Sequence, residues 1–429
     1  MIKSNVINRR HAIKGAGAAA AATLTGITGF PAIAQNTALK IGILTPKGGI
    51  AATAGENGLR GSQWAVERIN KAGGIAGRKV ELVVEEETNP QNTIERFNKL
   101  VLQDKVDMVQ GIVSTGVALA MGPVIEDSKK LTIMWDGTTQ DGVTEKLPDA
   151  RYCFKSTDNE CEAVMASLLA IKYFKGKFKT IAGINPDYSY GRNNWAAFKA
   201  LLKRFGIEHT VVAEQWPKVG GMEMTSFVAA LKAAKPDLIF SSLLFADLPV
   251  FMQQAHAAEL TKSSLLVFPA AGWQHTSLKK SFTPEGMIFG HNTLYFDHPS
   301  PSPLQKEFVD WYVATYKDYP HWEADRAYFA MESYKVAVET AQKAKSAWPA
   351  QEDVIDTLRT GIKVQSLGGP GWFRKDNIAE QTFIQGLTTH KNAYDFCTLG
   401  QIHTMTSDVL QKPPGADFWK WIETAKFPV

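Results

Sequence analysis

Apolar residues recur along the chain with two different spacings, and the two spacings alternate. In residues 58–72, apolar side chains such as Ala65 and Ile69 return at helical intervals, which is typical of an amphipathic helix. Residues 79–86 place apolar side chains at every second position from Val80 onwards, as a half-buried strand does. The pattern therefore predicts a helix followed by a strand in this part of the chain.

Glycines separate these two elements in the stretch RINKAGGIAGRKVELVVEEE, residues 68–87. Glycine-rich loops that hold phosphate follow a strand and precede a helix, because the anion lies at the helix N-terminus. Here Gly73 and Gly74 follow a helix, where a left-handed residue often ends it. The carbonyl end of a helix repels phosphate. We therefore interpret the glycines as a tight helix-to-strand corner and not as a nucleotide site.

The same alternation continues twice along the chain, which predicts two parallel sheets flanked by helices. The first series of strands is expected at 38–44, 79–86, 106–110 and 131–135, with helices at 58–72, 89–104 and 116–128. The second series is expected at 179–185, 207–216, 236–245 and 263–268, with helices at 193–206, 223–235 and 247–259. Two further amphipathic helices, at 302–316 and 323–345, and a hairpin within 366–387 follow.

The first 34 residues have a different character from the rest. They begin with basic residues, including Arg9 and Arg10, continue through a mildly apolar middle and end in small residues up to Ala34. This order predicts an export signal that is cleaved near Ala34. The paired arginines resemble a twin-arginine signal, although Ala12 replaces the aromatic residue usual there, which leaves the export route open.

Charge and cysteine content narrow the function classes. The chain has 47 basic and 43 acidic residues, and the four basic residues of the signal account for the whole surplus. A mature chain without net charge has no basic excess for nucleic acid, and no metal-ligand spacing or cofactor motif is present. Cys153, Cys161 and Cys397 allow one disulfide with a third thiol, or three buried thiols.

The stretches RGSQWAVERINKAGGIAGRKVELVVEEETNPQNTIERFNKLVLQ, GIVSTGVALA and PDYSYGR together resemble periplasmic solute-binding proteins for branched-chain amino acids and amides. The resemblance covers nearly the whole mature chain. It implies an α/β, two-lobed type I periplasmic binding protein fold, with each lobe an open, mostly parallel sheet and a cleft between the lobes. It also implies a small-molecule ligand and an inner-membrane ABC permease as partner, and we expect a monomer without cofactor, in the periplasm.

The chain is expected to cross from one lobe to the other three times, near 153–156, 284–288 and 378–382. The expected parts are residues 1–34 as signal, 35–153 with 287–379 as first lobe, 154–286 with 380–402 as second lobe, and 403–429 as a tail packed on the surface.

Ligands of open parallel sheets lie beyond the carboxyl ends of the strands. Ser114 and Thr115 begin a helix after such a strand, and their hydroxyls can hold a carboxylate or only cap the helix. The resemblance favours ligand binding. The remaining candidates, placed by the same resemblance after later strands, are Asp136, Gly137, Thr138, Tyr190, Leu244, Phe245, Ala270 and Ala271.

Several of these positions depart from the resembled family. Ala270 and Ala271 occupy the place where its amino-acid binders have a glutamate for the α-ammonium, and Ala54 replaces an aromatic residue. A buried ammonium without a counter-charge is costly. Either Asp136 or another acid, such as Asp187 or Asp247, replaces the lost glutamate, or the ligand has no ammonium.

We therefore expect a small carboxylate or amide with aromatic lining from Phe245, Trp135 and Trp273, with a branched-chain amino acid as competitor. Trp135 fits a core position equally well. Two rival functions remain, a ligand-sensing periplasmic receptor of the same fold and, remotely, a hydrolase. Against the hydrolase, the sequence contains no GxSxG, GxGxxG or HExxH motif, and an anchored receptor would need a spanning segment after the lobes.

Overall fold

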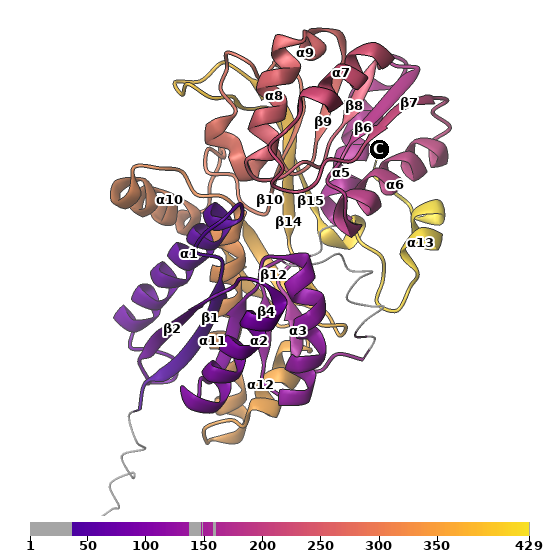
Figure 1. Ribbon diagram of the computed structural model, residues 1–429. Helices are drawn as coiled ribbons and strands as arrows, with labels where there is room; N and C mark the ends of the chain where they lie inside the picture. The colour runs from indigo at the N-terminus through magenta and orange to yellow at the C-terminus, as the bar shows by residue number, and fades with distance from the viewer. Residues whose placement is uncertain (1–36, 137–146, 148, 158–159, 429) are drawn as a thin grey trace, which may run out of the picture. The chain divides into compact units, whose positions relative to one another are not determined.

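The computed structural model describes residues 37–136, 147, 149–157 and 160–428, and residues Thr37–Val429 form one unit. The expected export signal lies outside the described residues. Two larger sheets and one small sheet make up the fold, with helices packed against the sheets (Figure 1).

The first sheet has five parallel strands in the order β2-β1-β3-β4-β5. Its strands are β1 (Leu39–Thr45), β2 (Val80–Glu86), β3 (Met108–Gly111), β4 (Thr132–Met134) and β5 (Cys153–Lys155). The associated helices are α1 (Ala52–Lys71), α2 (Pro90–Asn98), the π-helical turn η1 (Lys99–Gln103), α3 (Thr115–Ser128), α10 (Pro303–Tyr316), α11 (Trp322–Lys345) and α12 (Gln351–Leu358).

Side chains of successive strand residues enter different cores, so both faces of this sheet are covered. Ile41 and Ile43 pack with residues of α1 and α11, whereas Leu44 packs with residues of α2 and α3. Near-complete burial on both faces is what a parallel sheet with helices on either side requires. The residues at the start of α2 are typical of a helix N-terminus. Asn89 accepts a hydrogen bond from the Asn92 N–H, and Pro90 is the first residue of the helix.

The second sheet has seven strands in the order β15-β14-β10-β9-β8-β6-β7. Its strands are β6 (Thr180–Ile184), β7 (Thr210–Gln215), β8 (Leu238–Phe240), β9 (Leu265–Phe268), β10 (Ile288–Asn292), β14 (Thr382–Thr389) and β15 (Thr398–Thr406). Its helices are α5 (Glu160–Phe174), α6 (Ser189–Arg204), α7 (Thr225–Ala234), α8 (Asp247–Ala257), α9 (Leu260–Ser263), the 3-10 turns η2 (Ala271–Ser277) and η3 (Ser407–Val409), and α13 (Phe418–Thr424).

Helix α5 is central to this second sheet, and the sequence pattern did not predict it. Apart from Lys172 and Tyr173, every residue of α5 is buried. A helix that is apolar all round lacks the periodic polar stripe that marks an amphipathic helix. The helix packs with α6 and α13 on one face of the sheet, while α7, α8 and α9 cover the other face.

The chain passes between the sheets at three places. It leaves the first sheet after β5 and returns after β10 to α10, α11 and α12, which pack in the core of the first sheet. It enters the second sheet again between the short strand β13 (Ala379–Glu380) and β14. The return was expected near 284–288, and the structure corrects this expectation. Strand β10 pairs with β9 and β14, so it belongs to the second sheet and the return follows Asn292.

Residues within the expected hairpin form part of a small antiparallel sheet of β11 (Val364–Ser366), β12 (Gly369–Phe373) and β13. The expected tail also begins later than residue 403, because β15 pairs with β14 as far as Thr406. Beyond it, Phe418 and Ile422 of α13 are buried against the core of α5 and α6.

Cys153, Cys161 and Cys397 all lie within the described residues and are buried thiols, not disulfides. Among the described residues, no helix combines the length and the apolar character needed to span a membrane.

The glycine corner between α1 and β2 yields a stability test. Gly73 and Gly74 both have positive φ, of 108° and 88°, but only Gly74 is crowded, since a Cβ there would lie 2.1 Å from the Arg78 carbonyl oxygen. We expect Gly73→Ala to lower the free energy of unfolding by about 1–2 kcal/mol, the cost of a left-handed alanine. Gly74→Ala should cost about 1–3 kcal/mol more because of the clash. Urea denaturation of both variants measures the difference, and equal losses would contradict the crowding argument.

Candidate functional site

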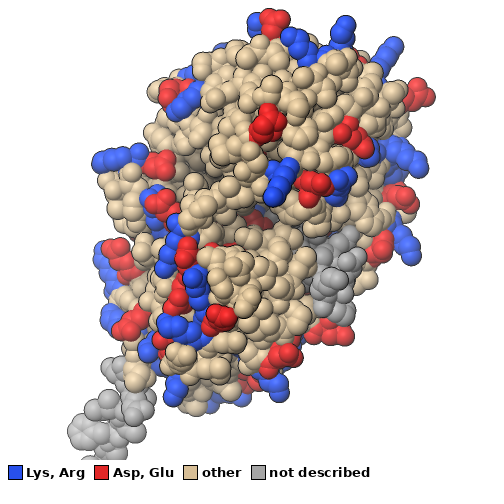
Figure 2. All heavy atoms as spheres, in the orientation of Figure 1, with Lys and Arg blue, Asp and Glu red and all other residues tan. Residues whose placement is uncertain are grey.

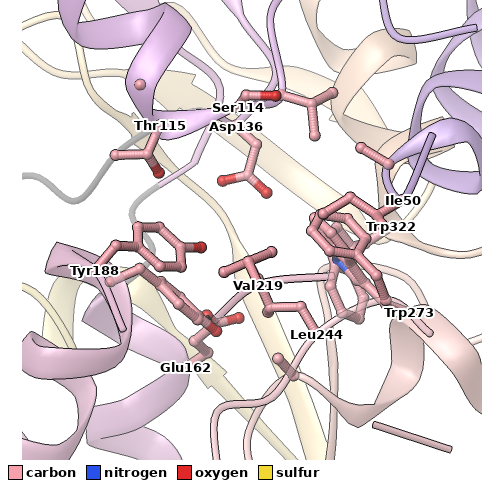
Figure 3. A pocket seen from close by; sticks show the side chains of 16 residues that line it. Ile50, Ser114, Thr115, Asp136, Glu162, Tyr188, Val219, Leu244, Trp273 and Trp322 are labelled. Carbon is pink, nitrogen blue, oxygen red and sulfur yellow. Dashed lines mark hydrogen bonds between the residues drawn. The ribbon is translucent and has the colours of Figure 1, made fainter. Parts of the chain in front are cut away.

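A cavity of about 230 Å³ lies where residues from both larger sheets meet (Figure 3). Polar side chains gather on one side of it, and Ile50, Trp273 and Trp322 lie on the other. The sixteen lining residues are Ile50, Ala51, Val113, Ser114, Thr115, Gly116, Asp136, Glu162, Tyr188, Tyr190, Val219, Leu244, Phe245, Ala270, Trp273 and Trp322.

The N-terminus of α3 opens onto this cavity. The first backbone hydrogen bond of the helix runs from the Ala118 N–H to the Ser114 carbonyl, so the N–H groups of Thr115 and Gly116 precede it. The Ser114 side chain makes no capping bond to the helix. The positive end of the helix dipole and these N–H groups suit a negatively charged group in the cavity.

Glu87 holds this helix entry in place. Its carboxylate accepts the backbone N–H groups of Val113 at 2.7 Å and Ser114 at 2.8 Å. Burial raises the pKa of Glu87. The preceding residue, Ile112, has a φ of 66°, a conformation that a β-branched residue seldom adopts. Strained residues of this kind persist where the surrounding structure fixes them, often at binding sites.

Asp136 follows shortly after the end of β4. Arg326 of α11 holds its side chain in place. The Arg326 guanidinium donates to Asp136, and it also lies 3.3 Å from the Glu323 carboxylate. Arg326 and Glu323 are completely buried and Asp136 is nearly so. Burial raises the pKa of Glu323 well above its usual range, and the charge of Arg326 opposes this shift.

Glu162 of α5 is the second carboxyl on the cavity wall. It accepts hydrogen bonds from the Tyr190 hydroxyl at 2.5 Å and from the Asn292 side-chain amide at 3.0 Å. Burial is the main reason that its pKa is raised to about 8, and nearby Asp136 adds to the shift. A pKa of about 8 favours the protonated form of the Glu162 carboxyl at neutral pH.

Aromatic rings form the opposite wall. The ring centroids of Phe245 and Trp273 are 4.5 Å apart, and those of Trp273 and Trp322 are 5.5 Å apart. The buried indole N–H of Trp273 has no hydrogen-bond partner among the described residues. The wall can thus pack against a flat or branched apolar group and still offer a hydrogen-bond donor.

Most of the sequence candidates lie on this cavity. The structure places seven of them in its lining, namely Ser114, Thr115, Asp136, Tyr190, Leu244, Phe245 and Ala270. Gly137 and Thr138 fall outside the described residues. Ala271 does not line the cavity, because it begins η2 and is buried in the core beside α8.

Other sequence expectations are corrected by the structure. Trp135 belongs to the core, where its indole N–H donates to Gln110 at 2.9 Å, and Ala54 is likewise a core residue. Asp187 forms an exposed pair with Arg192, and Asp247 accepts the N–H groups of residues 220 and 222. Neither acid lines the cavity.

The sequence analysis did not name eight of the lining residues, which are Ile50, Ala51, Val113, Gly116, Glu162, Tyr188, Val219 and Trp322. One signal was available for Glu162: an acid inside a mostly apolar run, ECEAVMASLLAIKYF, is costly to bury unless it is paired or functional. Tyr188 lies two residues before Tyr190 in the quoted motif, and their rings stack with centroids 5.9 Å apart. No local pattern distinguishes the other six positions. No group of three His, Cys, Asp or Glu side chains arranged for a metal ion occurs among the residues described.

Removal of the Arg326 charge should destabilise the protein strongly. Arg326→Gln leaves Asp136 buried opposite an uncharged partner, and loss of one member of a buried pair costs about 3–5 kcal/mol. Lys306→Gln, which breaks the exposed pair with Asp310, is a matched control that should cost less than about 1 kcal/mol. Denaturant unfolding measures both, and similar small losses would show that Asp136 does not depend on Arg326.

The raised pKa of Glu162 predicts that the stability of the protein, measured without added ligand, depends on pH. The folded protein keeps the Glu162 proton up to about pH 8, whereas an exposed glutamate loses it near its ordinary pKa of 4.5. Between these values the folded state binds more protons, so the free energy of unfolding falls as the pH rises towards 8 and levels off above it. The difference between wild type and Glu162→Gln, measured from pH 4 to 9, isolates this contribution. A flat difference would mean that Glu162 is ionised throughout.

Comparison with known proteins agrees with this architecture. The family model described as periplasmic binding protein matches residues 38–386. A Leu/Ile/Val-binding protein of Rhizobium johnstonii is 26% identical over 367 residues, which cover 84% of this chain and 94% of the relative. A leucine-, isoleucine-, valine-, threonine- and alanine-binding protein of Pseudomonas aeruginosa is 23% identical, with 85% and 93% covered.

Solved structures with the same fold include a solute-binding protein of an ABC transporter from Rhodopseudomonas palustris in complex with 3,4-dihydroxybenzoic acid. It has a TM-score of 0.73 and 22% identity, and the alignment covers 86% of this chain and 98% of that one. A branched-chain amino acid transporter substrate-binding protein from Streptococcus pneumoniae in complex with isoleucine has a TM-score of 0.69 and 19% identity, with 86% and 100% covered.

The predicted fold class is thereby confirmed as mixed α/β with mostly parallel sheets in the two-lobed type I arrangement. Family, fold and cavity position agree with one another. The chain belongs to the periplasmic binding protein family, in its type I group of branched-chain amino acid-binding relatives.

Proposed function

We propose that this protein is the extracytoplasmic solute-binding component of an ABC importer. It binds a small carboxylate with an apolar body, such as an amino acid, an aromatic acid or a related amide, and delivers it to an inner-membrane permease. The observation that supports this function best is the N-terminus of α3, which opens with Ser114, Thr115 and Gly116 onto a cavity with a tryptophan-lined wall.

The two ends of the cavity suit the two parts of such a ligand. The helix N-terminus offers N–H groups and hydroxyls to a carboxylate. The aromatic wall offers apolar surface to the remainder. A cavity of about 150 Å³ suffices for a benzene molecule. The cavity of about 230 Å³ therefore has room for a ring or branched chain together with a carboxylate.

The ligands of related proteins are of this kind. Relatives in sequence are named for leucine, isoleucine and valine. Neighbours in structure are complexes with benzoate, 4-hydroxybenzoate or isoleucine. All of these ligands join one carboxylate to an apolar group, which supports the same class for this chain.

Binding would act through closure of the two lobes. Thr115 and Asp136 belong to segments of the first sheet, whereas Tyr190 and Phe245 belong to segments of the second. A ligand that contacts both sets stabilises the state in which they face each other across the cavity. The permease would recognise that closed state.

The sequence and surface are consistent with a freely diffusing periplasmic carrier. Residues 1–34 are proposed to direct export and to be removed near Ala34. Basic and acidic side chains are interspersed over the face drawn in Figure 2, without a large basic area for nucleic acid. The family is one of binding proteins and not of enzymes, and we propose that the chain binds its ligand without chemical change.

A ligand screen tests this function directly. We expect the melting temperature of the purified protein to rise with a subset of small carboxylates, among them leucine, phenylalanine, benzoate and 4-hydroxybenzoate, because a ligand that binds only the folded state stabilises it. Small-angle scattering with the best ligand should show a smaller radius of gyration. Absence of binding by every carboxylate would contradict the proposal, and so would turnover of a bound compound.

The α3 contact is tested in the same assay by Thr115→Val, which removes the hydroxyl and keeps the side-chain shape. We expect affinity for the best carboxylate to fall about 10-fold, the loss of one hydrogen bond to a charged group, with unchanged unfolding. Thr225→Val, at the exposed start of α7, is the control and should leave affinity unaltered.

A further inference from the structure

A second cavity, of about 220 Å³, lies at the other end of the first sheet from the ligand cavity. Val106 and Asp107 on its wall precede β3, and Lys130 precedes β4. The ligand cavity is lined instead by residues that follow these two strands, such as Ser114 and Asp136. Because β3 and β4 are parallel, the two cavities lie at opposite ends of the same strands.

Helix α11 also contributes to both cavities, at different heights. Trp322, its first residue, lines the ligand cavity, and Tyr334 lines the second cavity. The rise of a helix places these two residues about 18 Å apart along its axis. A small ligand cannot span this distance, so the second cavity is a separate space.

The lining of the second cavity is more basic than acidic. Lys105 and Lys130 contribute two ammonium groups, and Asp107 contributes one carboxylate. Neither lysine forms an ion pair with any of the described residues, and the Lys130 ammonium donates to the Val106 carbonyl at 2.9 Å. The Asp107 carboxylate accepts the backbone N–H of Lys40 at 2.8 Å. One positive charge of the lining therefore has no counter-charge.

Partial burial makes this surplus of positive charge costly. The side chain of Lys130 is half-buried, and desolvation lowers the pKa of its ammonium, while the charge of Asp107 opposes the shift. A cation that has lost part of its hydration is stabilised by an opposite charge within a few ångströms. An anion in the cavity would supply that charge to Lys130.

Tyr334 adds a hydrogen-bond donor that the fold does not use. Only 5% of Tyr334 is exposed, and its hydroxyl makes no hydrogen bond to another residue within the described part of the chain. Buried hydroxyls usually have a partner, so an unused one on a cavity wall indicates a ligand. Trp348, which is 40% exposed, also lines the cavity, and the Arg78 guanidinium lies 4.4 Å from the centroid of its ring.

We propose that this cavity is a second binding site, for one small anion that carries a carboxylate or a phosphate group. Lys105 and Lys130 are its charge partners, and the Tyr334 hydroxyl donates a hydrogen bond to it. About 150 Å³ suffices for a benzene molecule, so the cavity has room for the anionic group and a small body. The site goes beyond the proposed function, because it is separate from the ligand cavity and both can be occupied together.

Thermal unfolding in the presence of simple anions tests the site. We expect sodium phosphate at about 20 mM to raise the melting temperature of the purified protein by about 1–3 °C over sodium chloride of equal ionic strength, because an anion that binds only the folded state stabilises it. Sodium sulfate and sodium acetate are measured in parallel. The larger shift distinguishes a phosphate-like ligand from a carboxylate, and isothermal titration calorimetry with the same salts gives the affinities.

Two variants test the residues of the site. Tyr334→Phe removes the hydroxyl and keeps the buried ring, and we expect the affinity for the most effective anion to fall about 10-fold, the loss of one hydrogen bond to a charged group. Lys130→Gln removes a charge partner and should lower the affinity by about 10-fold or more. Lys262→Gln, an exposed lysine of α9, is the matched control for loss of one positive charge and should leave the affinity unaltered.

Thr115→Val separates the two cavities, since it changes the ligand cavity alone. We expect the effect of the anion to persist in this variant and in Lys262→Gln, and to weaken in Tyr334→Phe and Lys130→Gln. Equal melting temperatures in all salts would overturn the second site, and so would a shift that both of its variants retain. A shift that weakens only in Thr115→Val would assign the anion to the ligand cavity, which overturns the second site and leaves the proposed function standing.

Discussion

The buried pair of Asp136 and Arg326 is the interaction on which the site depends. It joins the loop after β4 to α11, two segments 190 positions apart in sequence, at the wall of the cavity. A buried ion pair contributes little net stability when compared with apolar residues, but loss of one member is costly. This asymmetry makes the pair a device for fixing geometry: Arg326 holds Asp136 at the cavity wall, although both side chains are almost fully buried.

Around that pair, the protein holds several buried acids in different surroundings. Glu87 fixes the entry of α3 through two backbone N–H groups. Burial raises the pKa of Glu323 next to Arg326, and Glu162 lies on α5, a helix that is buried along most of its length. The same residue type thus serves as an anchor for a helix, as a buried neighbour of an arginine and as a group on the cavity wall. Desolvation separates these roles, because it penalises the charged form wherever no cation or N–H group compensates.

The strand-helix alternation carried most of the fold prediction, since helical and strand spacings are local properties of the chain. The prediction failed at α5, because a helix that is buried on nearly all sides has no regular alternation of apolar and polar residues. It also failed at β10, whose place in the second sheet depends on pairing with β9 and β14. The glycine corner was interpreted correctly because element order and residue type sufficed: α1 ends at Lys71 and β2 begins at Val80, with Gly73 and Gly74 between them.

The sequence by itself determined the alternating architecture, the family and the half of the site that follows strand ends, such as Ser114, Thr115 and Asp136. Only the tertiary structure decided the charge balance of the cavity. It brought Glu162 and Arg326 to Asp136, moved Trp135 into the core and placed Trp322 on the wall. The physical reason is that helix and strand periods act between near neighbours in sequence, whereas burial and pairing of charges depend on residues that meet only after the chain has folded.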